Sequence, residues 1–138
     1  MHQRTLTIIK PDGIQQRVAG DVIGHFERAG FRIAAARLVH LTKAEAEGFY
    51  AVHRERPFFA SLTAFMASGP CMPMVLEGEE VIARLRTLMG ATDPARADAG
   101  TIRKLYASSV ERNIVHGSDS PESAVTEIRY FFSDLDLV

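Results

Sequence analysis

A histidine between a short β-branched run and a glycine is the side chain best placed for chemistry in this sequence. His116 follows Ile114 and Val115, and a strong helix start comes shortly after it, with Ser120 as a candidate N-cap and Pro121 at the first helical position. A helix N-terminus favours an anion, because its free N–H groups and its dipole both present positive charge. We therefore expect His116 to act as a nucleophile in phosphate chemistry.

Polar side chains at the ends of other expected elements could complete such a site. These are Lys10, Arg86, Thr92, Arg103 and Asn113. Two guanidinium groups and an ammonium would suit a polyphosphate, because arginine binds phosphate oxygens in pairs and lysine supplies a compact charge. Phe58, which follows Pro57 at an element start, offers an exposed aromatic platform for a base.

Each of these side chains also has an ordinary structural interpretation. A lysine at a strand end is usually solvated, Arg86 can pair on the surface with Glu79 or Glu80, Phe58 can belong to the core, and His116 can be structural. Hydrophobic periodicity cannot show whether the six side chains converge in space.

Other chemistries find little support. His116, Ser118 and Asp119 are of the types found in a catalytic triad, but residues this close in sequence rarely reach its geometry, and no G-x-S-x-G turn is present. None of the five histidines has the spacing of a zinc site, so we expect no metal-binding residues. The sequence also lacks a P-loop and a G-x-G-x-x-G turn, so a nucleotide would bind by another route.

Length and composition limit the class of protein. The 138 residues predict one domain, residues 1–138, and the formal net charge of -1 gives no basic field for nucleic acid. No apolar run is long enough to cross a bilayer, and the first residues have no signal-peptide core. Cys71 is the single cysteine, which indicates a reducing setting. We therefore expect a cytoplasmic protein without a membrane contact or a dedicated nucleic-acid site.

The elements that would position these residues follow from the apolar pattern. We expect strands over 5–9, 31–41, 71–77 and 113–115, and helices over 18–29 and beginning near 42, 58, 79 and 120. Thr42 and Glu45 match a capping box. Residues 10–13 read as a turn and 91–112 as a long irregular loop. This order predicts an α/β (α+β) fold, a ferredoxin-like βαββαβ sandwich in which a four-stranded antiparallel sheet carries helices on its faces.

The segment around His116 also resembles a known family. Asn113-Ile114-Val115-His116-Gly117-Ser118-Asp119 is similar to the N-x-x-H-G-S-D motif of nucleoside diphosphate kinases, and the resemblance extends from Thr5 to about Phe132. Other similar segments follow in the family's order: residues 5–13, Arg56-Pro57-Phe58-Phe59, Ser68-Gly69-Pro70, Val75-Leu76-Glu77-Gly78, Leu88-Met89-Gly90-Ala91-Thr92 and Gly100-Thr101-Ile102-Arg103. The bacterial-type members with a short C-terminus are the most similar.

The resemblance implies a reaction and its cofactor. The γ-phosphate of ATP or another NTP would pass to an NDP by a ping-pong mechanism through a phosphohistidine on His116, which maintains the NTP and dNTP pools. Mg²⁺ would arrive bound to the nucleotide phosphates. Members of this kind are homo-oligomers, and for this chain a tetramer is favoured over a hexamer.

The resemblance also implies a role for each matching residue. His116, Glu127 and Lys10 would be catalytic, with Glu127 orienting the imidazole from the last helix. The nucleotide would be bound by Lys10, Tyr50, Phe58, Arg86, Thr92, Arg103 and Asn113. Within this set the two arginines, Lys10 and Thr92 would hold the phosphates, Asn113 the sugar and Phe58 the base.

Two departures from the family lie beside the site. Lys104-Leu105-Tyr106 replaces the usual small, acidic and aromatic sequence, and Ala99 stands where many members have proline.

An alternative function is a non-catalytic module of the same fold that senses nucleotides, binds nucleic acid or acts as a scaffold. An RNA-binding domain of similar plan is a third interpretation, but the strands lack the aromatic residues that it requires.

Overall fold

Four antiparallel strands form the sheet that carries the rest of the chain. The computed structural model describes residues 1–138, and its strands are β1 (His2–Ile9), β2 (Arg32–Ala36), β3 (Met72–Glu79) and β4 (Val115–Gly117). Their order in the sheet is β2-β3-β1-β4, with every neighbouring pair antiparallel. This arrangement confirms the ferredoxin-like fold predicted from the sequence.

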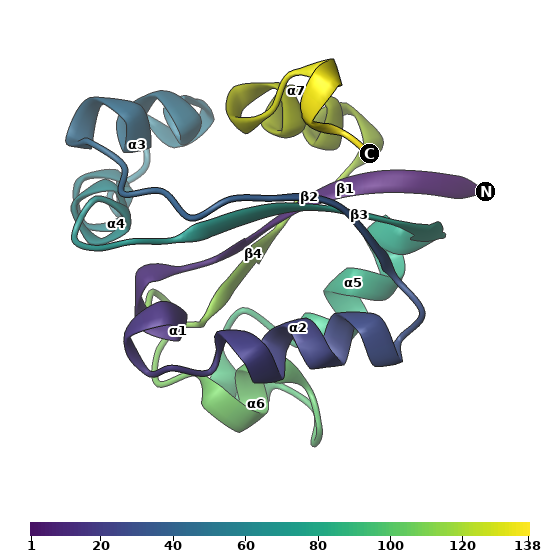
Figure 1. The fold of residues 1–138 in the computed structure, drawn as a ribbon. Helices are drawn as coiled ribbons and strands as arrows, with labels where there is room; N and C mark the ends of the chain where they lie inside the picture. Colours follow the sequence, from purple (N-terminus) through teal and green to yellow (C-terminus); the bar gives the residue numbers. More distant parts are fainter.

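Helices cover both faces of this sheet. They are α1 (Pro11–Gln15), α2 (Ala19–Arg28), α3 (Lys43–Phe49), α4 (Phe59–Met66), α5 (Val81–Met89), α6 (Ile102–Tyr106) and α7 (Pro121–Phe131). Three single 3₁₀ turns are also present: η1 (Ala51–His53), η2 (Pro94–Arg96) and η3 (Asp134–Asp136). Figure 1 shows α3, α4 and α7 on one face and α1, α2, α5 and α6 on the other. No helix in the structure combines the length and the apolar character needed to cross a bilayer.

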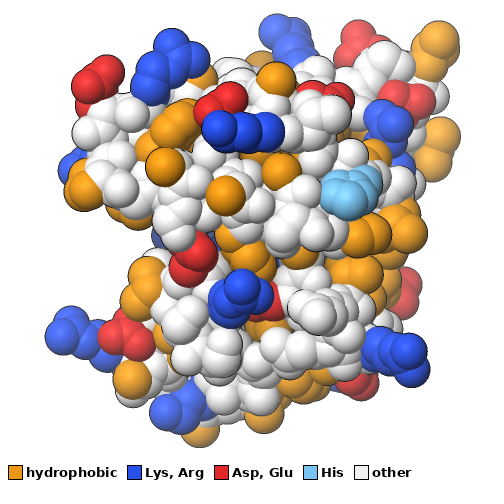
Figure 2. Space-filling model, turned by 90° about the vertical axis from the view of Figure 1, so that its left-hand side faces the viewer, with side chains coloured by type: hydrophobic (Ala, Val, Ile, Leu, Met, Phe, Trp, Pro, Cys, Tyr) orange, Lys and Arg blue, Asp and Glu red, His pale blue; other side chains and the backbone are white.

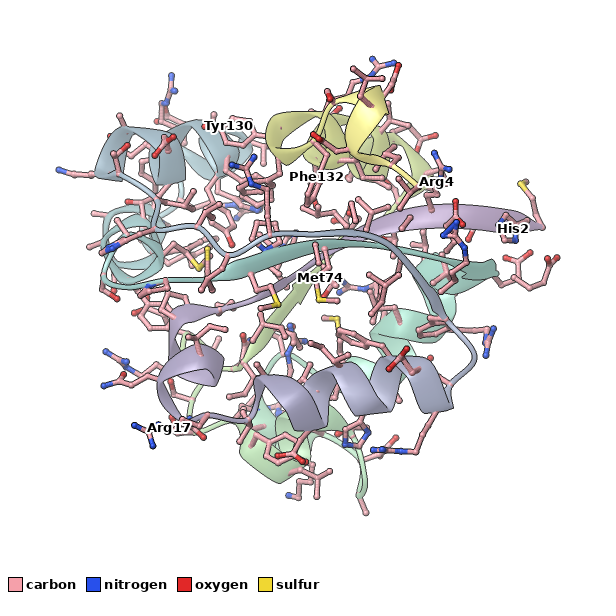
Figure 3. All side chains as sticks on the ribbon, in the orientation of Figure 1. His2, Arg4, Arg17, Met74, Tyr130 and Phe132 are labelled. Atoms are coloured by element: carbon pink, nitrogen blue, oxygen red, sulfur yellow. The ribbon has the colours of Figure 1, made fainter.

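Two separate cores hold the layers to the sheet, because alternate strand residues point to opposite faces. One contains Phe26 and Met74 and lies on the side of α2 and α5. The other contains Leu6 and Phe132 and lies on the side of α3, α4 and α7. Figure 3 shows Met74 on the sheet and Phe132 below α7. The strands that end at the site are therefore packed on both sides, which gives the site rigid support.

The clearest local signals in the sequence produce the expected helix ends. The Thr42 hydroxyl accepts the Glu45 N–H at 3.1 Å while the Glu45 carboxylate accepts the Thr42 N–H at 2.8 Å, which is the predicted capping box. The Ser120 hydroxyl accepts the Ser123 N–H at 3.1 Å at the start of α7. Gly90, with φ of +90°, ends α5 in a conformation that favours glycine.

Three expectations about local structure are wrong. Residues 10–13 are not a simple turn, because Pro11 occupies the first position of helix α1. The expected loop 91–112 contains η2 and α6, which are each too short to show a helical period. The last strand begins at Val115 rather than at 113, because Ile114 has φ of +75° and cannot continue an extended strand. As a result His116 lies within β4 and not after it.

Candidate active site

A cavity of about 370 Å³ opens where the ends of β1 and β4 meet the segments around α4 and α6. Seven of the nine residues selected from the sequence line it: Lys10, Tyr50, Phe58, Thr92, Arg103, Asn113 and His116. Leu62, Val110, Glu111 and Val115 complete the lining. Figure 2 views the molecule from the side of α3 and α4, and the outline is hollowed at mid-height. The residues with polar chemistry therefore converge, although they come from six separate stretches of chain.

The imidazole of His116 is held from behind by α7. Its Nε2 lies 2.7 Å from Oε1 of Glu127, and the Ser118 hydroxyl donates to the same oxygen at 2.8 Å. The main chain is fixed as well, since the Thr7 hydroxyl donates to the His116 carbonyl at 2.7 Å. With Nε2 engaged by a carboxylate, Nδ1 is the ring nitrogen left for a reaction partner.

Lys10 is buried at the end of β1, so it is not the solvated lysine of the ordinary interpretation. Its side chain is 5% exposed, and Nζ donates to the Glu111 carbonyl at 2.7 Å and to Oδ1 of Asn113 at 2.9 Å. Burial lowers the pKa of Lys10 to about 8, against a smaller opposite effect of the nearby Asp12 carboxylate. An anionic ligand would stabilise the charged form of Lys10, which burial has made less favourable.

Arg103 reaches the cavity from α6 with its guanidinium already oriented. Nη1 donates to the Gly90 carbonyl at 3.0 Å and Nη2 to the Val115 carbonyl at 2.8 Å. Burial lowers the pKa of Arg103 to about 10, and the neighbouring positive charge of Arg86 adds to this. No carboxylate neutralises this guanidinium, so it keeps a positive charge for a ligand.

Arg86 lies just outside the cavity, in an adjoining hollow of about 410 Å³ that shares Thr92 with it. Nη1 of Arg86 donates to the Gly117 carbonyl at 3.2 Å, next to His116. The surface pairing of Arg86 with Glu79 or Glu80 is absent, because both carboxylates contact the N-terminal amine instead. Arg86 therefore extends the positive region along β4, and Thr92 adds a neutral hydroxyl beside it.

The mouth of the cavity is apolar. Phe58, immediately before α4, is 46% exposed, and Val110 is 56% exposed on the segment before β4. Phe58 is thus not a core residue. Deeper in the cavity, Tyr50 is buried with its ring 6.1 Å from the His116 ring in an edge-to-face arrangement, and burial raises the pKa of its hydroxyl. A planar apolar group fits the mouth, and an anion fits the interior.

Sequence reasoning missed two polar side chains of the site. Ser118 binds the carboxylate that holds the histidine, although its place in the His116 motif was a usable signal. Glu111 lies on the cavity wall, and its carboxylate accepts a hydrogen bond from the Ser61 hydroxyl of α4 at 2.8 Å. Nothing in the local sequence around Glu111 marks it, because the contact joins residues 50 positions apart.

The departures from the family pattern do not enter the cavity. Lys104 and Leu105 are exposed on α6, and the Tyr106 ring packs edge-to-face against His25 at 6.1 Å. Ala99 lines a different groove of about 480 Å³ beside Phe31 and Arg84.

Fold and cavity together define a class. A ferredoxin-like sandwich presents buried cations and a carboxylate-held histidine below an exposed aromatic ring, which is the arrangement of a nucleotide-binding phosphotransferase.

Comparison with known proteins identifies the family within this class. The family model described as nucleoside diphosphate kinase matches residues 3–137. The nucleoside diphosphate kinase of Francisella philomiragia is 57% identical over 136 residues, covering 99% of this chain and 97% of that protein. The enzyme of Anaeromyxobacter dehalogenans is 58% identical over 135 residues, covering 98% and 92%.

Solved structures agree with this match. The nucleoside diphosphate kinase of Aquifex aeolicus superposes with a TM-score of 0.98 at 42% identity, and the match covers both chains completely. The enzyme of Halobacterium salinarum, solved with CDP, gives a TM-score of 0.95 at 37% identity and covers 100% of this chain and 92% of that one. The chain belongs to the nucleoside diphosphate kinase family, and it is a kinase that acts on nucleotides.

Proposed function

We propose that this kinase transfers the γ-phosphate of an NTP to an NDP through a phosphohistidine on His116. The observation that carries the proposal is the 2.7 Å contact between Nε2 and Glu127, which leaves Nδ1 as the free nucleophile. The ring proton stays on Nε2, facing the carboxylate. The cell would use the reaction to maintain its NTP and dNTP pools.

The two half-reactions would use the same atoms in opposite directions. The Nδ1 lone pair forms a bond to the γ-phosphorus, the bond from that phosphorus to the bridging oxygen breaks, and the NDP leaves with the electron pair. A terminal phosphate oxygen of a second NDP then attacks the phosphorus, the P–N bond breaks, and its electrons return to Nδ1. One cavity can serve donor and acceptor in turn, which is the basis of a ping-pong mechanism.

The cations would bind phosphate rather than carry out covalent chemistry. Phosphoryl transfer depends mainly on positioning and on neutralising charge. We assign Lys10, Arg86, Thr92 and Arg103 to the phosphate oxygens. The proposal is supported by the burial of Lys10 and Arg103 and by the absence of a neutralising carboxylate at the guanidinium of Arg103.

Base and sugar would lie toward the mouth. We assign Phe58 to stacking on the base and Asn113 to the sugar, with Tyr50 close to the reacting ring. Stacking on an aromatic ring accepts every base, because every base has a π-face. Broad tolerance among nucleotides follows.

Magnesium would be bound mainly by the substrate. The described residues bring together no group of three or more His, Cys, Asp or Glu side chains. Phosphate oxygens and water commonly supply most ligands of Mg²⁺ in such enzymes, so the chain need not form a cage of its own. The bound ion would neutralise phosphate charge, while Lys10 and Arg103 orient the phosphates.

The phosphohistidine is testable by labelling. Brief incubation with γ-labelled ATP and Mg²⁺ is expected to give an acid-labile, base-stable label, and His116→Ala is expected to remove it. His40→Ala, at an exposed histidine position outside the cavity, is a suitable control that keeps the label. A label that survives in His116→Ala would overturn the assignment. A wild-type protein that takes up no label would favour the alternative, a non-catalytic nucleotide sensor or scaffold.

We also propose a homo-oligomer, with a tetramer favoured over a hexamer. Several large apolar side chains away from the cavity are more than half exposed: Leu38, Leu105, Leu135 and Val138. β2 is also an edge strand; the Val138 N–H occupies the Ala34 carbonyl at this edge, and the rest of it is a further surface that a second copy could use. Light scattering is expected to give four times the chain mass of 15.2 kDa, and a mass of one or six chains would contradict the proposal.

A further inference from the structure

Ile114 has a main-chain conformation that its side chain opposes. Its φ is +75°, although a β-branched residue rarely enters the left-handed region. The side chain is completely buried, so Ile114 cannot relax without moving its neighbours. This residue lies directly between Asn113, which lines the cavity, and the start of β4, which carries His116.

The N–H and the carbonyl of Ile114 both form hydrogen bonds to residues that directly follow β1. Oδ2 of Asp12 accepts the Ile114 N–H at 3.0 Å, and the Ile114 carbonyl accepts the Lys10 N–H at 2.7 Å. Asp12 is 4% exposed, and its other carboxylate oxygen, Oδ1, is buried without a hydrogen-bond partner. Burying a carboxylate is unfavourable unless it is paired; the ammonium of Lys10 lies near enough to offset part of this cost, and the Ile114 N–H is the one hydrogen-bond partner of the carboxylate.

Packing at this point leaves the Ile114 main chain little freedom. A Cβ built on Gly13, the residue after Asp12, would lie 2.8 Å from Cγ2 of Ile9 and 3.3 Å from Cγ2 of Ile114. Helix α1 therefore packs more tightly against Ile9 and Ile114 than a side chain at position 13 would allow, with the closer contact at Ile9. The Asp12 carboxylate lies beside this contact and accepts the N–H of Ile114, the residue with positive φ.

We propose that Asp12 is a positioning residue that holds Ile114 in its left-handed conformation. Asn113 precedes Ile114 in sequence and His116 follows it. The reversal of the chain at Ile114 lets both side chains face the same cavity. Asn113 is held by Lys10, and the Val115 carbonyl is held by Arg103 at 2.8 Å. Asp12 does not line the cavity and acts through Ile114. The inference rests on the proposed role of His116 and adds a group that fixes the main chain leading to it.

Kinetics of a double-mutant cycle test this. Asp12→Ala is expected to lower the rate of His116 phosphorylation by about 10- to 100-fold, because the strained N–H loses its charged acceptor. The same change on an Ile114→Gly background is expected to cost less than about threefold, because glycine adopts positive φ without help. Asp12→Asn keeps an oxygen acceptor and is expected to rescue most of the rate. Asp21→Ala, an exposed acid in the first turn of α2, is the matched control.

The cycle separates this role from two others. Equal losses on the wild-type and Ile114→Gly backgrounds would overturn the proposal and make Asp12 a general stabilising residue. Losses in Asp12→Asn as large as those in Asp12→Ala would overturn it as well, because the charge near Lys10 would then be what matters. If Asp12→Ala does not fold, Asp12→Glu is used instead, because the longer glutamate side chain misplaces the acceptor. The Ile114→Gly change must then restore the phosphorylation rate of Asp12→Glu.

Labelling and the mutant cycle together distinguish a wrong role for Asp12 from a wrong role for His116. A wild-type label that persists in His116→Ala would remove the nucleophile assignment. A label confined to His116 together with an additive cycle would remove only the role of Asp12.

Discussion

At the scale of single residues, the Glu127 carboxylate determines which nitrogen of His116 faces the cavity. Two donors, Nε2 of His116 and the Ser118 hydroxyl, converge on the same oxygen, Oε1. Ser118 is itself buried and bound to the main chain of Leu6. The carboxylate is therefore fixed by a group that belongs to the sheet, and it transmits that order to the ring.

Removing the charge of Glu127 tests this positioning. Glu127→Gln keeps an oxygen that can accept from Nε2 but loses the negative charge, so we expect kcat to fall by about 10- to 100-fold, the value of a hydrogen bond to a charged group. KM for nucleotides should change little, because the carboxylate lies behind the ring. Steady-state kinetics at saturating donor measures both. Glu122→Gln on the same helix is the control, and an equal loss there would contradict the role.

The depressed pKa of Lys10 predicts a pH dependence. The ammonium is charged below its pKa of about 8 and loses its charge as the pH rises through that value, so kcat/KM is expected to fall above pH 8. Lys10→Arg stays charged and should lack this alkaline limb, even if its absolute rate is lower. Lys104→Ala, at an exposed lysine beside the site, should keep the limb. A limb that persists unchanged in Lys10→Arg would assign it to another group.

Residue types predicted most of the site, but not its internal contacts. Lys10, Arg103 and Asn113 were recognisable because charged and amide groups at element ends and in a long loop suit a polyphosphate, although the sequence could not show that they converge. Glu111 and Asp12 were not, since their functions depend on contacts with Ser61 and Ile114 that are 50 and 102 positions away. Sequence spacing carries no information about such distant pairs.

At the scale of elements, two walls form the mouth of the cavity. One is α4 with the preceding Phe58, and the other is the segment that carries Val110 and Glu111. The hydrogen bond from Ser61 to the Glu111 carboxylate joins them, and the Glu111 carbonyl also accepts from Lys10. The width of the mouth is thus coupled to the wall that holds the lysine.

Breaking this link should affect binding more than chemistry. Ser61→Ala removes one hydrogen bond worth about 1 kcal/mol, so we expect KM for nucleotides to rise by about two- to tenfold while kcat changes less. A change in the width of the cavity mouth should raise KM for both bases. Measuring KM with ATP and with GTP as donors shows whether it does. Ser108→Ala, at an exposed serine of the same wall, is the control. A loss restricted to one base would mean that Glu111 reads the base edge instead.

Elements with strong local signals were predicted, and elements defined by tertiary contacts were not. The capping box at Thr42 and the N-cap at Ser120 place α3 and α7 because the signal lies within one turn. Helix α6 has five residues, too few for a helical period, and β4 begins late because Ile114 is held in the left-handed region by Asp12. The conformation at Ile114 runs against its intrinsic preference, so propensity alone leads to the wrong strand boundary.

At the scale of the whole molecule, the cavity joins segments that are distant in sequence, and this gives nucleotide binding an effect on global stability. Lys10 follows the first strand, Phe58 precedes α4, Arg103 lies in α6 and His116 in the last strand. A ligand that contacts all of them binds the folded chain and not the unfolded one. It must therefore raise the free energy of unfolding by mass action.

The size of this effect should depend on the phosphates. At about one hundred times its Kd, a nucleoside diphosphate is expected to stabilise the fold by about 2.7 kcal/mol, which raises Tm by several degrees in a chain of this size. The nucleoside alone, at the same concentration, should give a much smaller shift, because Lys10 and Arg103 are the buried groups that gain a partner. Differential scanning calorimetry with ADP and with adenosine makes the comparison, and Lys104→Ala is the control that keeps the full shift. Equal shifts with both ligands would show that stacking at Phe58 dominates binding, and the buried cations would then need another explanation.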